Sequence, residues 1–188
     1  MELVFDTETT GIINYRGKVG DASQPHIVQL GAQLYDDNKR IKGELNLLIK
    51  PDGWTIPQEA TDVHGISTED CEKYGIPIRS ALGLFNLWLA FGPRLVAHNI
   101  DFDVFLVETE AIRLGKESFL NPYEKRCTMK ASTNLVGIPN KTRGGFKWPK
   151  LQETHVKLFG SEFEGAHDAM ADVRACARVN FELKNRGL

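Results

Sequence analysis

An apolar strand near the start of the chain runs directly into a pair of acids, and this junction constrains the fold more than any other segment. Residues 3–5 are Leu-Val-Phe, and Asp6 and Glu8 follow without a break before Gly11. Side chains alternate across a strand with a period of two, so both carboxylates point to the same side. At a separation of about 4 Å they repel by roughly 4 kcal/mol at the effective dielectric of a protein site, which favours a divalent metal ion between them. The alternative is a strand that emerges into solvent at Asp6, where both acids solvate a turn.

Length and composition indicate an ordinary globular protein. The chain has 188 residues, of which 41% are hydrophobic and 26% charged, and this fits one domain with a sizeable core. We expect a cytoplasmic protein without membrane contact, because no apolar stretch could span a bilayer and the start does not resemble a signal peptide. Three widely spaced cysteines favour neither a disulfide framework nor a zinc site. The formal charge of -2 neither favours nor excludes a polyanionic substrate.

Hydrophobic periodicity and turn residues predict three strands first and then alternating helices and strands. The expected strands after the first are 27–35, 41–49, 94–97 and 126–129, and the expected helices are 57–63, 67–74, 82–91, 99–114, 130–136, 151–159 and 168–184. The first three strands should pair as an antiparallel meander, and the later ones should add in parallel. Most of the helix at 82–91 should lie in the core. This order predicts an α/β fold with a mixed sheet flanked by helices.

A second acidic cluster follows the expected strand at 94–97. Asp101 and Asp103 lie in the first turn of the next helix. Strand ends in open α/β sheets are where ligand sites form, so one of these acids can face the pair on the first strand. The alternative is that either acid only complements the helix dipole, which is the better explanation for Asp101.

A third cluster opens the last helix. Asp168 is a natural N-cap, whereas Asp172 lies one turn deeper among small and apolar neighbours and needs a partner. Arg174 or Arg178 could pair with it along the helix surface. His167 precedes the cap, where a polar loop residue is the alternative to a catalyst.

Three segments, VFDTETTG, AHNIDFDVFL and AHDAMADVRACA, occur in this order. Together they resemble the three motifs of the DEDDh (DnaQ-like) 3′–5′ exonucleases, and in particular the polymerase III epsilon-type proofreading enzymes. The resemblance covers nearly the whole chain and implies a ribonuclease H-like fold, with residues 1–188 forming a single 3′–5′ exonuclease domain. Residue by residue, it identifies five catalytic positions. Four are acids that would also bind metal, Asp6, Glu8, Asp103 and Asp172, and the fifth is His167.

The resemblance also implies the chemistry. Two divalent cations, Mg²⁺ or Mn²⁺ because all ligand atoms are oxygen, would support hydrolysis of the phosphodiester bond at a nucleic acid 3′ end. His167 would be the general base, and the products would be 5′ mononucleotides. We expect single-stranded DNA as the partner in preference to RNA, and an exoribonuclease that trims RNA 3′ ends is the alternative.

Three residues near the expected site are candidates for substrate contacts. Thr7 and Thr9 offer hydroxyl or backbone contacts to the terminal sugar. His64 lies in the segment DVHGIS, which resembles a stretch that lies beside the terminal nucleotide in proofreading-type members. The alternative for His64 is a solvent-facing imidazole at a helix end.

Lys141 and Arg143 are further candidates, on the expected loop at 140–150. This loop contains four cations, no acids and two aromatic residues, a combination suited to phosphate contacts and base stacking. The alternative is a solvated loop that anchors Trp148 in the core.

Two other functions compete with the exonuclease. Haloacid dehalogenase-type phosphatases also place an acidic pair after an apolar strand, but their second acid is Asp where this chain has Glu8. A nucleic-acid-binding module with an inactive site is the non-enzymatic alternative, although all five expected polar residues are present. The chain ends at Leu188, just after the last expected helix, so we expect a free-standing bacterial or viral enzyme. A homodimer and an association with a polymerase both stay open.

Overall fold

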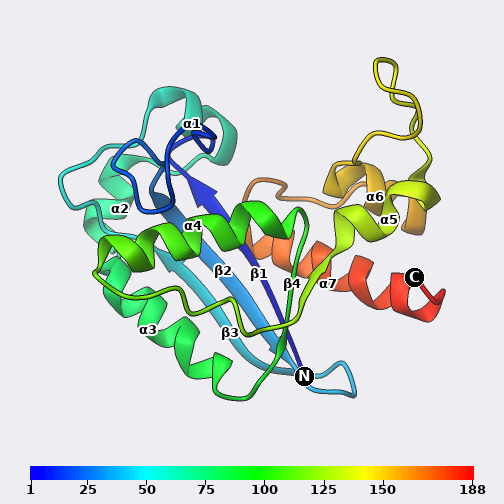
Figure 1. Ribbon diagram of the computed structural model, residues 1–188, viewed down its shortest axis with the longest axis horizontal. Coiled ribbons are helices and arrows are strands. Elements are labelled where there is room, and N and C mark those ends of the chain that lie inside the picture. The colour runs from blue at the N-terminus through cyan, green and yellow to red at the C-terminus, as the bar shows by residue number, and fades with distance from the viewer.

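A five-stranded mixed sheet with helices on both faces organises the protein, as the computed structural model of residues 1–188 shows (Figure 1). The strands lie in the order β3-β2-β1-β4-β5. The first three form the antiparallel meander, and β4 and β5 continue the sheet in parallel with β1. The strands are β1 (Glu2–Thr9), β2 (Ile27–Tyr35), β3 (Ile41–Leu48), β4 (Arg94–Ala97) and β5 (Lys125–Cys127). The predicted α/β fold with a mixed sheet is confirmed.

Seven helices connect and cover the strands. They are α1 (Gln58–His64), α2 (Thr68–Tyr74), α3 (Ile78–Leu89), α4 (Ile100–Arg113), α5 (Thr128–Val136), α6 (Leu151–Phe159) and α7 (Ala169–Asn185). Local sequence explains several of their ends. For example, Ser67 and Asp70 form the capping box that starts α2, and Gly65 ends α1 in the left-handed conformation. No helix combines the length and the apolar character needed to cross a membrane.

The alternation of β1 divides the core between two layers. Leu3 and Phe5 belong to the large cluster under α3 and α4, where the Phe5 and Phe85 rings meet edge to face with centroids 5.3 Å apart. Val4 points the other way and packs with Val173 of α7. A single strand therefore serves two helical layers, and each layer receives every second side chain.

The strand β2 is more deeply buried than its sequence predicts. Apolar and polar residues alternate along it, yet all nine residues are buried because helices cover both sides of the sheet. Its polar side chains have partners there: Gln33 Nε2 donates to Glu44, and the Tyr35 hydroxyl donates to Gln33 Oε1. The polar residues of β2 thus reflect buried hydrogen bonds and not a solvated face.

Helix α3 begins at Ile78, four positions before the expected start, and only one of its faces is buried. Leu87 and Phe91 are 66% and 61% exposed, so the expectation that most of this segment is core is wrong. The apolar residues of this stretch surround the helix, but the sheet can cover only one side of it.

A glycine at the centre of β2 allows α7 to approach the sheet. Gly31 pairs with Asp6, and a Cβ atom on Gly31 would lie 2.8 Å from the backbone carbon and oxygen of Ala169 at the start of α7. Backbone atoms cannot yield as a flexible side chain does. The absence of a side chain at Gly31 therefore sets the distance between the end of β1 and the start of α7.

We expect Gly31→Ala to lower the free energy of unfolding by about 1–3 kcal/mol, as overpacking against fixed backbone does. Urea unfolding followed by circular dichroism measures the change. The matched control is Gly83→Ala in α3, where a Cβ atom meets nothing within 4 Å. This control should stabilise the protein by about 0.4–1 kcal/mol, because alanine restricts the unfolded chain. Equal effects of the two substitutions would contradict the close approach of α7.

Candidate active site

The C-terminal end of β1 presents carboxylates to one helical layer and a hydroxyl to the other. Asp6 and Glu8 share the orientation of Val4, toward α7, whereas Thr7 shares that of Phe5, toward α4. The acids of the later motifs lie on these same two helices. Strand alternation is thus the reason why one short segment contacts both.

Asp103 faces β1 from the first turn of α4. Its Oδ1 accepts the backbone N–H of Thr7 at 3.1 Å and the Thr7 hydroxyl at 2.9 Å, and the side chain is buried. Asp101 instead lies on the exposed side of the helix, where it pairs with Lys130 at 2.5 Å. The structure therefore places Asp103, the acid that the motif resemblance identifies, against β1, and Asp101 away from it.

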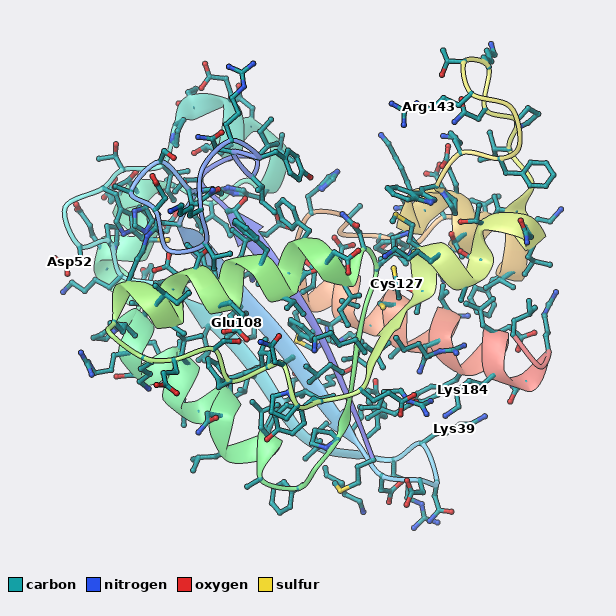
Figure 2. All side chains as sticks on the ribbon, viewed as in Figure 1. Lys39, Asp52, Glu108, Cys127, Arg143 and Lys184 are labelled. Carbon is teal, nitrogen blue, oxygen red and sulfur yellow. The ribbon has the colours of Figure 1, made fainter.

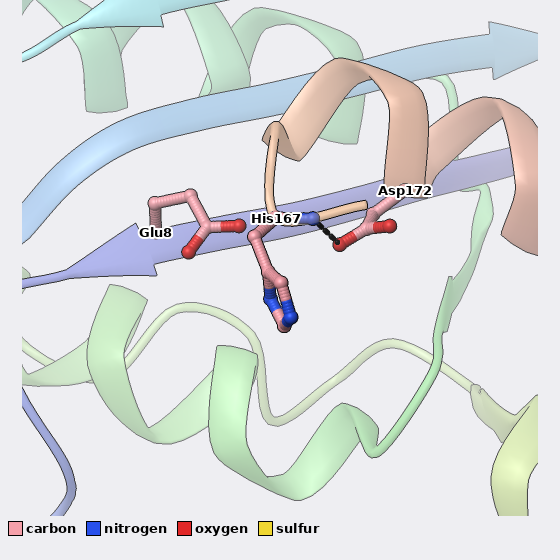
Figure 3. Close-up of side chains that lie close together, drawn as sticks. All are labelled: Glu8, His167 and Asp172. Carbon is pink, nitrogen blue, oxygen red and sulfur yellow. Dashed lines mark hydrogen bonds between the residues drawn. The ribbon is translucent and has the colours of Figure 1, made fainter. Parts of the chain in front are cut away.

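Asp172 and His167 come from the start of α7 and lie beside Glu8 (Figure 3). The ligand atoms of these three side chains all lie within 4.8 Å of one another. The His167 backbone N–H donates to Asp172 Oδ2 at 3.3 Å, and the exposed imidazole projects from this turn. The three motifs of the sequence therefore converge at one place, with Asp6 and Asp103 adjoining this group.

No basic side chain neutralises the cluster. None of the ion pairs in the structure includes Asp6, Glu8, Asp103 or Asp172. The two arginines that could have paired with Asp172 have other neighbours: Arg174 binds Glu44 at 3.1 Å, and Arg178 stacks on the Phe159 ring. The arginine alternative for Asp172 is therefore wrong.

Burial and mutual repulsion raise the pKa of every carboxyl in the cluster. The pKa of Asp6 lies well above its ordinary value, and burial is the larger cause and repulsion from the neighbouring acids the smaller one. The same causes raise the pKa of Glu8 to about 8. Burial raises the pKa of Asp103 to about 7, although the hydrogen bonds from Thr7 oppose this, and raises that of Asp172 to about 6. Four mutually repelling carboxylates that no basic side chain pairs with suit one or more divalent metal ions, which would relieve this repulsion.

Two residues next to the cluster adopt the left-handed backbone conformation. Asn99, between β4 and α4, has a φ of 73°, and His167, before α7, has a φ of 71°. Residues other than glycine rarely adopt this conformation, although asparagine and histidine do so more readily than most. Both turns redirect the chain so that an acid of the following helix faces the end of β1. Strain of this kind is typical of functional sites.

Two residues that support the site were not among the sequence predictions. Gln29 of β2 receives the Ala169 N–H on its Oε1 and donates from Nε2 to Asp168, so it holds the start of α7 against the sheet. Gly31 allows the close approach described above. A signal for both was present, because an amide and a glycine within a buried strand each call for a specific partner.

The proposed substrate residues occupy different places. Thr9 and His64 line a pocket of about 450 Å³ that reaches Glu8. Thr7 lines it too, with its hydroxyl and N–H already donated to Asp103. Lys141 and Arg143 do not join the cluster: both are exposed on the loop before α6, and Arg143 lies at its tip, away from the sheet (Figure 2).

Comparison with known proteins identifies the family. Residues 3–180 match the RNase_T model, described as Exonuclease. The chain belongs to this exonuclease family, the DnaQ-like group. It is 34% identical over 179 residues to the uncharacterized exonuclease CP81 of Escherichia phage 186. The aligned residues cover 92% of this chain and 82% of that protein. The resemblance inferred from the three motifs is confirmed.

Two longer proteins also match this chain, one in sequence and one in fold. A DNA polymerase III subunit epsilon-like protein of Rhodobacter capsulatus is 35% identical over 191 residues, which cover 99% of this chain and 24% of that protein. E. coli Exonuclease I in complex with a dT13 oligonucleotide superposes with a TM-score of 0.76 at 19% identity, over 98% of this chain and 41% of that one. The structural likeness confirms the ribonuclease H-like fold.

We expect Asp6→Asn to stabilise the metal-free protein in alkaline solution. An acid whose pKa is higher in the folded than in the unfolded state makes the folded state bind more protons, so stability falls as pH rises through that window. For Glu8 this window runs from 4.5 to about 8. In EDTA at about pH 8, removal of the Asp6 charge should raise the melting temperature by roughly 2–4 °C for each kcal/mol of repulsion relieved.

The difference between Asp6→Asn and wild type should shrink at about pH 5, where more of the carboxyls are protonated in both proteins. Differential scanning calorimetry measures both conditions. Asp101→Asn is the matched control, because Asp101 is exposed and paired with Lys130. A wild-type protein more stable than Asp6→Asn in alkaline EDTA would contradict the repulsion.

Proposed function

We propose that this protein is a metal-dependent 3′–5′ exonuclease that removes 5′ mononucleotides from the 3′ end of single-stranded DNA. One observation carries the proposal: the carboxylates of Asp6, Glu8, Asp103 and Asp172 converge beside His167, and no basic side chain pairs with any of them. Membership of the exonuclease family supports hydrolysis, and Exonuclease I, which shares the fold, is known in complex with a dT13 oligonucleotide. In this proposal residues 1–188 form a single exonuclease domain.

The four carboxylates would hold two divalent cations, Mg²⁺ or Mn²⁺, because oxygen ligands suit these ions. Such ions, when bound, activate water and stabilise the charge that develops around phosphorus. The protein's part is to hold the ligands in place. Thr7 orients Asp103, and the His167 backbone N–H orients Asp172.

His167 is the general base in this proposal. A ring nitrogen of His167 takes the proton from the attacking water as the bond from phosphorus to the 3′ oxygen of the preceding nucleotide breaks. Solvent protonates the leaving 3′ oxygen and receives the proton from the exposed imidazole. The left-handed turn and the backbone bond to Asp172 hold the ring beside Glu8 (Figure 3). The base is therefore positioned by its backbone and not by a partner for its ring.

The terminal nucleotide would occupy the pocket between the end of β1 and α1. Its volume of about 450 Å³ is in the range of small-molecule sites, and it opens beside Glu8. His64 lines it in the neutral form, because burial lowers the pKa of His64. His64 Nδ1 accepts the Ile66 N–H, so its Nε2 carries the hydrogen. This Nε2 is buried and lies toward the backbone of Thr9, so in this proposal His64 shapes the wall of the pocket. Lys141 and Arg143 would contact phosphates farther along the strand.

The direction of cleavage is tested with two labelled forms of one single-stranded oligonucleotide. With Mg²⁺, the 5′-labelled strand should shorten one nucleotide at a time, whereas the 3′-labelled strand should lose its label at once as a mononucleotide. EDTA should stop both reactions, because it removes the divalent cations that the carboxylates would hold. Faster loss from a matched RNA strand would favour the exoribonuclease, and binding without degradation would favour an inactive module.

We expect His167→Asn to lower kcat about 10²–10⁴-fold, the usual contribution of a general base. Asparagine tolerates the left-handed backbone at this position and cannot accept the proton, so it separates catalysis from folding. Oligonucleotide affinity, measured by fluorescence anisotropy in EDTA, should stay unchanged. Turnover close to that of the wild type would remove His167 from the role of base.

A further inference from the structure

A second pocket adjoins the acid cluster on the side away from the proposed nucleotide pocket. It has a volume of about 370 Å³ and reaches His167 and Asp172, whereas the first pocket reaches Glu8. Trp148 and Lys150 line it, just before α6. Figure 1 shows α1 and α6 on opposite sides of the end of β1. The two pockets therefore flank the reacting centre.

Trp148 presents its ring to solvent at the edge of this pocket. It is 65% exposed, so the alternative in which the loop anchors Trp148 in the core is wrong. Its flat aromatic surface is therefore available to a ligand. An exposed indole beside a catalytic centre suits a flat, apolar ligand.

The backbone on both sides of Trp148 is firmly held although its ring is free. Pro149 is buried, and its carbonyl accepts a hydrogen bond from His98 Nε2 at 3.0 Å. His98 Nδ1 accepts the Thr128 hydroxyl at 2.9 Å, and burial lowers the pKa of His98 to about 4, so the ring stays neutral in this arrangement. Lys147, before Trp148, pairs with Glu153 at 2.6 Å. The indole is thus held on a rigid support, which reduces the entropy lost on binding.

The charge around Trp148 suits a polyanion. Residues 140–150 contain four cations and no acids, and only Lys147 among the four forms an ion pair. Lys150 lines the same pocket as the indole. A flat aromatic ring beside unpaired cations is the arrangement with which proteins bind single-stranded nucleic acid.

We propose that Trp148 stacks on a nucleobase of the substrate strand on the 5′ side of the scissile phosphate, with Lys150 beside the adjoining phosphate. This inference rests on the proposed function. A strand whose terminal nucleotide fills the first pocket must leave the acid cluster on the other side, where His167 and Trp148 lie. A base can stack on Trp148 only when it has left a duplex, so this residue favours single-stranded substrates.

The test compares Trp148→Ala on two substrates. One is a single-stranded oligonucleotide, and the other is the p-nitrophenyl ester of thymidine 5′-monophosphate, which has a terminal nucleotide and a scissile bond but no upstream base. For the oligonucleotide, kcat/KM should fall roughly five- to a hundredfold, the loss expected for one stacking contact, and Trp148→Phe should recover most of it. Hydrolysis of the ester should not change.

Phe91→Ala is the matched control, because Phe91 is 61% exposed just after α3, away from both pockets. It should leave both reactions unchanged. A further comparison uses an oligonucleotide with abasic sites at the two positions next to the terminal nucleotide, on which wild type and Trp148→Ala should act equally.

Equal losses on the oligonucleotide and the ester would mean that Trp148 acts through the shape of the active site, and would overturn the proposal. An unchanged rate on the oligonucleotide would do the same, as would a Trp148→Ala deficit that persists on the abasic strand. A wild-type protein that degrades neither the intact nor the abasic oligonucleotide would contradict the proposed function itself.

Discussion

The mutual repulsion of four partly or fully buried carboxylates is the constraint on which the rest of the structure depends. Burial alone disfavours the charged form of each acid, and the neighbouring charges add to this cost. The surrounding residues hold the acids in place in spite of it. Thr7 gives Asp103 two hydrogen bonds, and Gln29 fixes the start of the helix that carries Asp172. The fold therefore maintains a cluster of acids whose mutual repulsion is relieved by protons or, in the proposed function, by divalent cations.

Strand alternation explains how so small a region gathers residues from distant parts of the chain. Successive side chains of β1 point to opposite layers, so Thr7 contacts α4 while Asp6 and Glu8 face α7. The tight approach of α7 at Gly31 then brings Asp172 to the same end of the strand. The main requirement on the sheet is thus geometric: one strand must end between two helices, and each of these helices must begin there.

The surroundings of the acids differ on their two sides. Toward α1 the pocket is lined by the end of β1 and by His64, and it suits one nucleotide. Toward α6 the surface carries an exposed indole and unpaired cations on a firmly held backbone. A linear polyanion that lies across the acids meets both surfaces. This asymmetry supports an enzyme that acts on the end of a strand and holds the adjoining segment.

The sequence by itself determined the order of the elements, the helix starts at capping residues such as Ser67 and Asp168, and the three motifs that contain the acids and His167. These features depend on local periodicity and on hydrogen bonds between near neighbours, which a sequence records directly. Only the tertiary structure decided that no arginine pairs with Asp172, that both faces of β2 are buried, and that Trp148 is exposed. Each of these depends on which distant segment covers a given face, and no local pattern contains that information.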